Sequence, residues 1–409
     1  MIDKPKVSMF YGWWIVLSGM VMGIYTAGIF FYGFTALFNP LRSTFGWSRT
    51  TMSVAFTLQR GETGVAGPVV GFLVDRFGPR RIILAGLVVM GIGLFSLTQI
   101  NNLGTFYAAY FIASVGFSGC SPLVANIPVA NWFRRKRARA MGILALGAGI
   151  SGLLLPGIVA LIEWLGWRTT LGVLGIGLWV ICMPLALVFR QRPEQYGLRP
   201  DGDLSTGVEI GEGNDRNKST YTLKETLRRK SFWALAAVHA LWLFAHTGVV
   251  VHIIPALTLD AEMTAGNAGL MAAGIPVLSI LGRVGFGWLG DFLDKRYVLM
   301  MAVGFQIFGL LLFRDAPNFA VIGLGVILYG IGIGGFIPVR NAVQADLFGR
   351  INYGKVQGMV ELFAQIGGIG GPVVTGLIAD SQGTYSFAFL ILAICPMIAI
   401  PIIRQIREN

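Results

Sequence analysis

Charged side chains are scarce in this sequence. Only 13% of its 409 residues are Asp, Glu, Lys or Arg, whereas a soluble domain carries roughly 25%. Hydrophobic residues make up 55% of the chain, and the mean hydropathy is +0.68. This composition excludes an ordinary soluble protein, because too few charged groups are present to cover a water-facing surface.

Cysteine, histidine and catalytic motifs are also sparse. The three cysteines, Cys120, Cys182 and Cys395, fall inside apolar runs and show no spacing typical of a disulfide or a metal site. The sequence shows no P-loop, no metal-ligand cluster and no nucleophile–base pair. We therefore predict that the protein is not an enzyme, and we assign no catalytic residue, metal or other cofactor.

Apolar runs of about 20 residues recur along the whole chain, and each is long enough to cross a hydrocarbon core of about 30 Å. They predict an all-α integral membrane protein with twelve transmembrane helices. The predicted spans are 11–38, 47–74, 81–100, 104–132, 138–163, 168–189, 231–258, 265–290, 297–314, 318–347, 355–379 and 384–403. The 56 glycines fit such a bundle, because small residues let membrane helices approach closely.

The sequence repeats itself at a fixed distance of 216 residues. Residues 71–75 (GFLVD) return as 287–291 (GWLGD), and the same shift carries Gly116, Gly119 and Pro122 onto Gly332, Gly335 and Pro338. One offset held through separate motifs indicates two halves that descend from one unit. We predict six-helix halves at 1–190 and 231–409, joined by a polar cytoplasmic linker at 191–230, with the substrate held between the halves.

Lysine and arginine are distributed unevenly about the predicted spans. Arg60, Arg283 and Arg340 fall within spans, and the remainder lie on the side of the termini except for Arg42, Arg49, Arg168 and Arg314. This positive-inside pattern predicts cytoplasmic termini and an inner (cytoplasmic) membrane location. The basic run 134–137 (RRKR) is interpreted as a topology signal beside anionic membrane lipid rather than as a nucleic-acid site.

The loop after the second span carries a recognisable motif. Residues 71–81 (GFLVDRFGPRR), with their second copy after the span 265–290, resemble the signature loop of the major facilitator superfamily. A carboxylate there can meet a helix N-terminus or an arginine across a gap. We predict that Asp75, Arg76, Arg80 and Asp291 are gating residues that hold one side shut. The alternative is that these charges only fix a tight turn and the topology.

Two further stretches narrow the resemblance. Residues 11–14 (YGWW) and 282–287 (GRVGFG) are similar to the monocarboxylate porter branch of that superfamily, including its oxalate–formate antiporter relatives. The glycine–proline runs at 147–156 and 367–372 predict helices that flex or slide where the halves meet, with static close packing as the alternative. The resemblance implies the twelve-helix major facilitator fold.

Arg283 is the strongest candidate for a substrate-binding residue. It lies eight residues before Asp291, about 12 Å inside the span at 1.5 Å per residue. Its own helix offers no acid at helical spacing, because Ser279 and Gly287 occupy those positions. A guanidinium suits a carboxylate, and the resemblance implies that this arginine binds the substrate's carboxylate. The alternative is an ion pair with Glu62 or Glu361.

Other residues are predicted to contribute to the substrate site. His252 precedes Pro255, and the resemblance implies a histidine of this span in the site of bacterial members. His239 and His246 share one helix face, so either is an alternative to His252. Aromatic residues are predicted to wall the cavity, with ordinary packing as the alternative: Tyr25, Tyr32, Phe117 and Tyr329. Arg340 lies near the end of its span and is interpreted as a gate or lipid contact.

The proton pathway of animal monocarboxylate transporters does not carry over, because Tyr32 and Ser279 stand where those proteins have lysine and aspartate. His252, Glu62 and Glu361 are the candidates for a coupled proton. The predicted function is alternating-access transport of a small organic monocarboxylate, such as lactate or pyruvate, with a proton. The alternatives are exchange of organic anions of the oxalate or formate type, efflux of a drug or metabolite, and a non-transporting membrane sensor.

Overall fold

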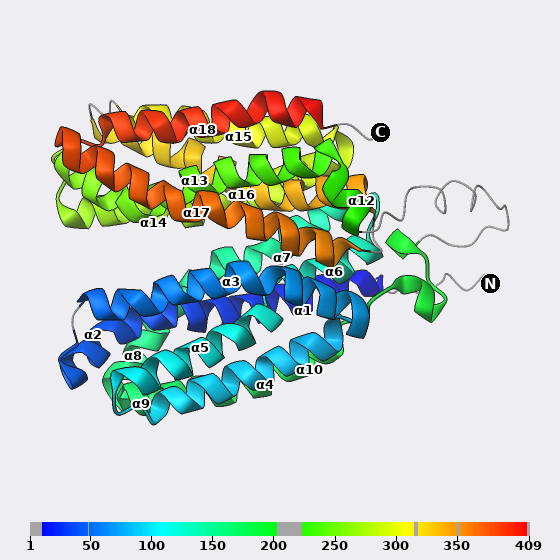
Figure 1. Ribbon diagram of the computed structural model, residues 1–409, viewed down its shortest axis with the longest axis horizontal. Helices are drawn as coiled ribbons and strands as arrows, with labels where there is room; N and C mark the ends of the chain where they lie inside the picture. Colours follow the sequence, from blue (N-terminus) through cyan, green and yellow to red (C-terminus); the bar gives the residue numbers. More distant parts are fainter. Residues whose placement is uncertain (1–9, 48, 203–222, 315–317, 350–351, 407–409) are drawn as a thin grey trace, which may run out of the picture.

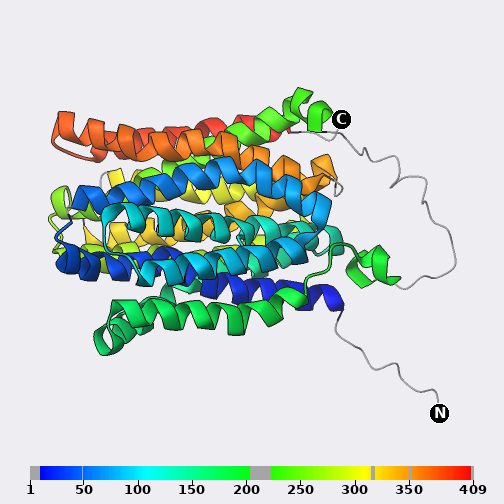
Figure 2. The same cartoon turned by 60° about the horizontal axis from the view of Figure 1, so that its bottom comes forward.

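The computed structural model describes residues 10–47, 49–202, 223–314, 318–349 and 352–406, and these ranges are built from helices without a strand. The helices run nearly parallel to the long axis of the molecule (Figure 1). The first helix begins and the last helix ends at the same end of the bundle (Figure 2). We call this end the termini side and the other end the opposite side.

The first half contains six spans, four of which are interrupted. Their bounds are α1 (Tyr11–Ala27) continued by η1 (Gly28–Gly33) and α2 (Phe34–Phe45); α3 (Arg49–Phe77); α4 (Pro79–Thr98); α5 (Leu103–Gly119) with α6 (Pro122–Trp132); α7 (Arg137–Ile150) with η2 (Ser151–Leu154) and α8 (Leu155–Leu165); and α9 (Trp167–Gly177) with η3 (Leu178–Cys182) and α10 (Met183–Leu187). The break before α6 coincides with Pro122 at its first position, where a proline is tolerated.

The second half contains six helices without such interruptions in their described residues. They are α13 (Lys230–Leu259), α14 (Ala265–Phe292), α15 (Lys295–Arg314), α16 (Phe319–Phe348), α17 (Tyr353–Gln382) and α18 (Ser386–Gln405). Between the halves lie η4 (Pro193–Tyr196), η5 (Pro200–Gly202) and α12 (Leu223–Arg228). The rest of the predicted linker, residues 203–222, lies outside the described residues.

The twelve predicted spans all correspond to observed helices, and their ends differ by three residues or fewer except that the first span continues to Phe45. Eleven of the described helical segments are long and apolar enough to cross a membrane. The twelfth is α3, which has 29 residues and therefore extends about 44 Å, but which carries Glu62 near its centre. Because the hydrocarbon core satisfies no backbone hydrogen bond, continuous helices are the expected way to cross it.

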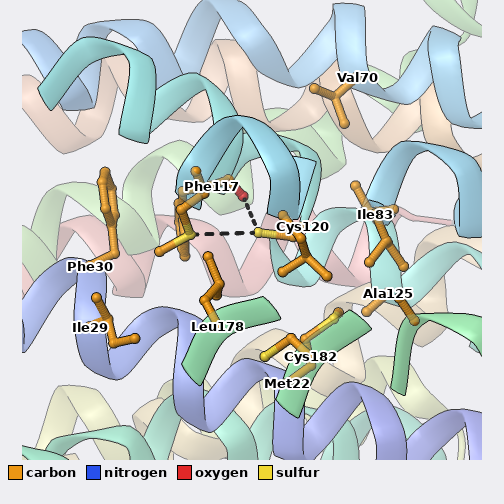
Figure 3. Packing of buried hydrophobic residues seen from close by; sticks show 14 of the residues in the cluster. Met22, Ile29, Phe30, Val70, Ile83, Phe117, Cys120, Ala125, Leu178 and Cys182 are labelled. Carbon is orange, nitrogen blue, oxygen red and sulfur yellow. Dashed lines mark hydrogen bonds between the residues drawn. The ribbon is translucent and has the colours of Figure 1, made fainter. Parts of the chain in front are cut away.

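The bundle contains two buried hydrophobic clusters, one in the second half and one in the first half that also includes Ala342, Ala345 and Tyr353 of the second. In the first half, Met22, Phe30, Phe117 and Leu178 pack around the free thiols of Cys120 and Cys182 (Figure 3). The Cys120 Sγ atom lies 4.0 Å from Met90 Sδ and donates to the Gly116 carbonyl oxygen at 3.4 Å. The second core is formed by residues of α13 to α18 with a few from the turns between them. The repeat read from the sequence is therefore also a repeat in packing.

The most extensive contacts between the two halves are made by two pairs of helices, α3 with α17 and α7 with α14, and smaller contacts join α7 to α16 and α6 to α17. At the first contact, a Cβ added to Gly71 would overlap the Gly354 carbonyl oxygen, so the two backbones meet directly. At the second contact, a Cβ added to Gly287 would lie 3.0 Å from the Ala138 carbonyl oxygen. The 216-residue shift relates these pairs, and the interface therefore has approximate twofold symmetry.

These contacts lie toward the termini side. Gly71 and Gly287 are in the last two turns of their helices, whereas Gly354 and Ala138 are in the first turn of theirs. On the opposite side, α8 packs on η1, η2, α2 and α9 of its own half. The described contacts thus close the molecule on the termini side.

Gly71→Ala should weaken this closure, because the added methyl group would overlap the backbone of α17, and a helix backbone cannot shift at one residue alone. We expect a destabilisation of about 1–3 kcal/mol, as for other overpacked sites, seen as a lower Tm of the purified protein in detergent. Gly61→Ala is the matched control in the same helix, because an added Cβ there meets nothing within 4 Å. Equal Tm values for both variants would contradict this account of the interface.

Candidate substrate site and gate

Asp75 lies in the last turn of α3 and reaches the start of α17 in the other half. Its Oδ2 atom accepts a hydrogen bond from the Lys355 backbone N–H at 3.1 Å. The first N–H groups of a helix lack partners in the helix and carry partial positive charge. The contact with a helix N-terminus that the sequence predicted for Asp75 is present, whereas its gating role stays a prediction.

Asp291 makes the equivalent contact at the end of α14. Its Oδ1 atom accepts from the backbone N–H groups of Ala138 at 3.1 Å and Arg139 at 3.2 Å. Its Oδ2 atom lies 3.3 Å from Nε of the Arg139 side chain. The two acid contacts are again related by the 216-residue shift. Arg76 and Arg80, the other predicted gating residues, are exposed on the termini side, where Arg76 lies over the Phe77 ring.

Arg137 joins the halves by an ion pair that the sequence did not predict. Its side chain is only 4% exposed and pairs with Asp346 near the end of α16. It also donates to the carbonyl oxygens of Phe133 at 3.0 Å and Ala130 at 3.2 Å. The interpretation of run 134–137 as a lipid-facing topology signal is therefore wrong for Arg137. The repeat gave no signal here, because the shift carries Arg137 onto Tyr353.

Arg283 lies on α14 at the contact with α7 of the first half. Its Nη1 atom donates to the Ala145 carbonyl oxygen at 2.7 Å, and a Cβ on Gly149 would overlap the same nitrogen. The two acids that the sequence offered as ion-pair partners bond elsewhere: Glu62 to serine hydroxyls and Glu361 to Arg340. Arg283 thus spans the seam between the halves, about 12 Å from the termini end of its helix.

Glu62 lies at a groove of about 720 Å³ on the first half, between α3, α4 and α5. Its carboxylate accepts hydrogen bonds from Ser114 at 2.5 Å and Ser118 at 3.1 Å. The other lining residues are almost all apolar, and Val65 and Phe111 among them are strongly exposed. Glu62 therefore faces the groove between α3, α4 and α5, and this groove is separate from the place where Arg283 contacts α7.

His252 lies farther from the termini side than Arg283 does. Its Nε2–H donates to the Pro372 carbonyl oxygen at 3.0 Å, and its ring centre is 5.5 Å from that of Tyr385. His252 is seven residues before the end of α13, whereas Arg283 is eighteen residues past the start of α14. Because a short turn joins these helix ends, the two residues differ in depth by about 16 Å.

Three of the predicted cavity aromatics pack inside their own halves instead. The Tyr25 hydroxyl donates to the Leu174 carbonyl oxygen at 3.2 Å. Phe117 is 4% exposed and stacks on Phe30, and Tyr329 is fully buried against Phe313. The structure does not bring these rings to Arg283. The Tyr32 and Arg60 side chains lie outside the described part of the chain.

A buried ionic cluster occupies the second half. Arg340 is 1% exposed, and its Nη2 atom donates to Glu361 Oε1 at 2.9 Å. The Nδ1 atom of His239 lies 3.9 Å from the other oxygen of that carboxylate. The interpretation of Arg340 as a lipid contact is therefore wrong, whereas its interpretation as a gate stays a prediction. Arg340 and Glu361 are each eight residues from the turn that joins α16 to α17, a spacing that could have predicted their common depth.

Comparison with known proteins agrees with this architecture. The Major Facilitator Superfamily model matches residues 15–313 and 247–407. Over 426 residues the chain is 24% identical to monocarboxylate transporter 12 of Xenopus laevis, with 98% of this chain and 90% of that protein covered. Over 407 residues it is 24% identical to the oxalate:formate antiporter of Oxalobacter formigenes, with coverages of 94% and 88%.

The solved structures show the same fold. FucP of E. coli in its outward conformation matches with a TM-score of 0.74 at 15% identity, covering 97% of this chain and 100% of that one. The protein is thus a multi-pass membrane transporter by fold and family. The chain belongs to the Major Facilitator Superfamily.

Proposed function

We propose that this protein transports small organic monocarboxylates of the lactate or pyruvate type, together with a proton, by alternating access. The observation that carries the proposal is the Arg283 guanidinium, which lies inside a membrane-spanning helix at the contact between the halves. Two relatives whose names specify monocarboxylate transport and oxalate:formate exchange support an organic anion as the cargo.

Arg283 is positioned to bind an anion, and a neutral acceptor is among its present contacts. The Ala145 carbonyl oxygen is a neutral acceptor, and a carboxylate forms a stronger, charge-assisted bond with a guanidinium. A carboxylate that replaces Ala145 would remove one hydrogen bond between α14 and α7 and so loosen their contact at this level. Substrate binding and loosening of the seam would then be one event.

The remaining contacts define the state in which the substrate would enter. With the termini placed in the cytoplasm of a cell with an inner membrane, the contacts of Asp75, Asp291 and Arg137 close the cytoplasmic side. The halves 1–190 and 231–409 would rock about the seam, and these contacts must break when the cytoplasmic side opens. Substrate therefore reaches Arg283 from outside in this state.

The predicted histidines differ in how close they lie to the depth of Arg283 in the membrane. His239 is twenty residues before the end of α13, so it lies within about 3 Å of the depth of Arg283, whereas His252 does not. His239, which the sequence offered as an alternative to His252, therefore lies at the level of Arg283, where it belongs to the ionic cluster of Arg340 and Glu361. His252, Tyr25, Tyr32, Phe117 and Tyr329 stay predictions as substrate contacts.

Uptake of labelled lactate into proteoliposomes tests the function. Accumulation driven by an inward proton gradient supports symport, which moves no net charge and so avoids about 2.3 kcal/mol per charge per 100 mV. Rapid exchange against internal oxalate or formate, without any response to the gradient, would assign the antiporter instead. Lack of lactate uptake in every condition would contradict the proposed cargo.

A further inference from the structure

The buried cluster of α13, α16 and α17 is the part of the membrane interior that anion binding leaves unexplained. Arg340 and His239 are 1% and 2% exposed, whereas the Glu361 side chain is 25% exposed. Intramembrane ion pairs are costly to desolvate and commonly mark proton or ion pathways. Glu361 is therefore the accessible edge of a charged site that is otherwise closed.

The cluster has more hydrogen-bonding capacity than its members use. Among the described residues, Nε and Nη1 of Arg340 and Nδ1 of His239 have no hydrogen-bond partner although they are buried. A purely structural ion pair would be expected to satisfy such groups, because a buried unpaired donor costs about 1–3 kcal/mol. The unused donors and the unused imidazole nitrogen indicate a site whose bonding changes during function.

We propose that Arg340, Glu361 and His239 form the site that binds the co-transported proton, separately from the anion at Arg283. The proposal rests on the proton-coupled function proposed above. The proton binds the Glu361 carboxylate, or passes through it to the imidazole of His239, and no bond between heavy atoms changes. A carboxylate and an imidazole are the side chains suited to this task near neutral pH.

Charge balance explains how such a site would couple proton and anion. With Glu361 ionised and His239 neutral, Arg340 and Glu361 cancel and the cluster has no net charge. A bound proton gives the cluster one net positive charge, on whichever residue it resides. Arg283 lies at about the same depth, two turns from Asp291. The protonated cluster would thus favour a negative substrate at the seam and disfavour an empty site.

The groups around the carboxylate are few. Among the described residues, α13 contributes His239 and, two turns further on, His246, and α16 contributes Arg340. Helix α17 adds Tyr353, whose charge interactions include Arg340, Glu361, Arg137 and Asp346. The Tyr353 hydroxyl donates to the Asn341 carbonyl oxygen at 3.2 Å. From the other half, α3 presents Gly67, where an added Cβ would be 3.8 Å from the Glu361 Cβ. Among the residues that the structure describes, Arg340 and His239 are the charged or titratable side chains next to the Glu361 carboxylate.

Glu361→Gln is the decisive variant, because it leaves Arg340 unbalanced at every pH and so mimics the protonated cluster. A one-unit pH difference allows a 1:1 symporter to accumulate the anion up to about tenfold. We expect this ratio to fall to about one in Glu361→Gln, while exchange of labelled for unlabelled lactate persists and no longer depends on pH. Glu163→Gln changes an exposed acid of α8 in the first half, so it is the control and should retain the gradient response.

The double variant Arg340→Gln/Glu361→Gln removes both charges and guards against misfolding of the single variant. We expect it to lose the gradient response as well. Gradient-driven accumulation that survives in Glu361→Gln or in the double variant would overturn the proposal. So would loss of accumulation in Glu62→Gln alone, because that result would place the proton in the first half.

A measurement without substrate separates this proposal from the function itself. The Trp242 ring lies 5.7 Å from that of His239 but stacks on His246 at 4.9 Å, so the measurement is made in a His246→Phe background, where the fluorescence reports on the charge of the cluster. We expect a titration between pH 5 and 9 in the wild type that is lost in Trp242→Phe and in Glu361→Gln. A titration unchanged in Glu361→Gln, or none in the wild type, would overturn the proton site whether or not lactate is the cargo.

Discussion

Replacing Arg283 by alanine should lower lactate uptake at subsaturating concentration by about a hundredfold. The substitution removes a charged donor at the seam of the two halves. A hydrogen bond to a charged group contributes up to about 3 kcal/mol, and each 1.4 kcal/mol is tenfold in affinity. Arg283→Lys keeps the charge but loses the forked geometry, so we expect an intermediate loss. Initial rates in proteoliposomes with equal amounts of protein measure both effects.

Two further variants sharpen this test. Arg404→Ala removes an exposed arginine of α18 in the same half and should leave uptake unchanged. Gly149→Ala places a methyl group where Nη1 of Arg283 now lies, so it displaces the guanidinium without deleting it and should raise KM. Uptake that is the same in Arg283→Ala as in the wild type would remove this residue from the mechanism.

Replacing Arg137 by alanine should open the termini side. Arg137 is buried and pairs with Asp346 across the halves. Breaking a buried ion pair costs about 3–5 kcal/mol, but Asp346 is partly exposed and keeps Lys295 at 2.8 Å. We therefore expect a shift of about 2 kcal/mol toward the open state, about thirtyfold in the equilibrium. The interhalf distance between spin labels at the exposed positions Arg81 and Gln405 should increase.

The neighbouring Arg135→Ala is the control, because that side chain belongs to the same basic run but is exposed. Replacing Cys395 by serine first leaves only buried native thiols. The double variant Arg137→Ala/Asp346→Ala should resemble Arg137→Ala, because partners in one ion pair are not additive. An unchanged label distance in Arg137→Ala would show that the acid contacts of Asp75 and Asp291 close this side alone.

The sequence predicted the fold well because a membrane leaves the chain few choices. Each span must be a helix of about 20 apolar residues, and the 216-residue repeat pairs the halves. The same repeat predicted the positions of Asp75 and Asp291, whose contacts with helix N-termini follow from their place at helix ends. Helix α3 is less apolar than the other spans, but the predicted span 47–74 still matches its observed bounds.

The ion-pair partners of charged side chains were less predictable from the sequence. The sequence placed Arg340 near a helix end and Arg137 in a lipid-facing run, but both are buried in ion pairs with residues of other helices. His252 has the residue type that a substrate site needs but lies about 16 Å from the depth of Arg283. The spacing of residues along one helix predicts how deep a side chain lies in the membrane and on which helix face. It does not predict which side chain of a neighbouring helix that residue will contact.

The sequence by itself determined that this is a duplicated twelve-helix membrane protein with an arginine inside its eighth span. Hydrophobicity and helical periodicity are properties of the chain alone, so they are readable without the fold. Only the tertiary structure decided that Arg283 bonds to Ala145 and that Glu361 belongs with Arg340 and His239. These pairs depend on which helix faces lie together, and packing of the whole bundle sets that arrangement.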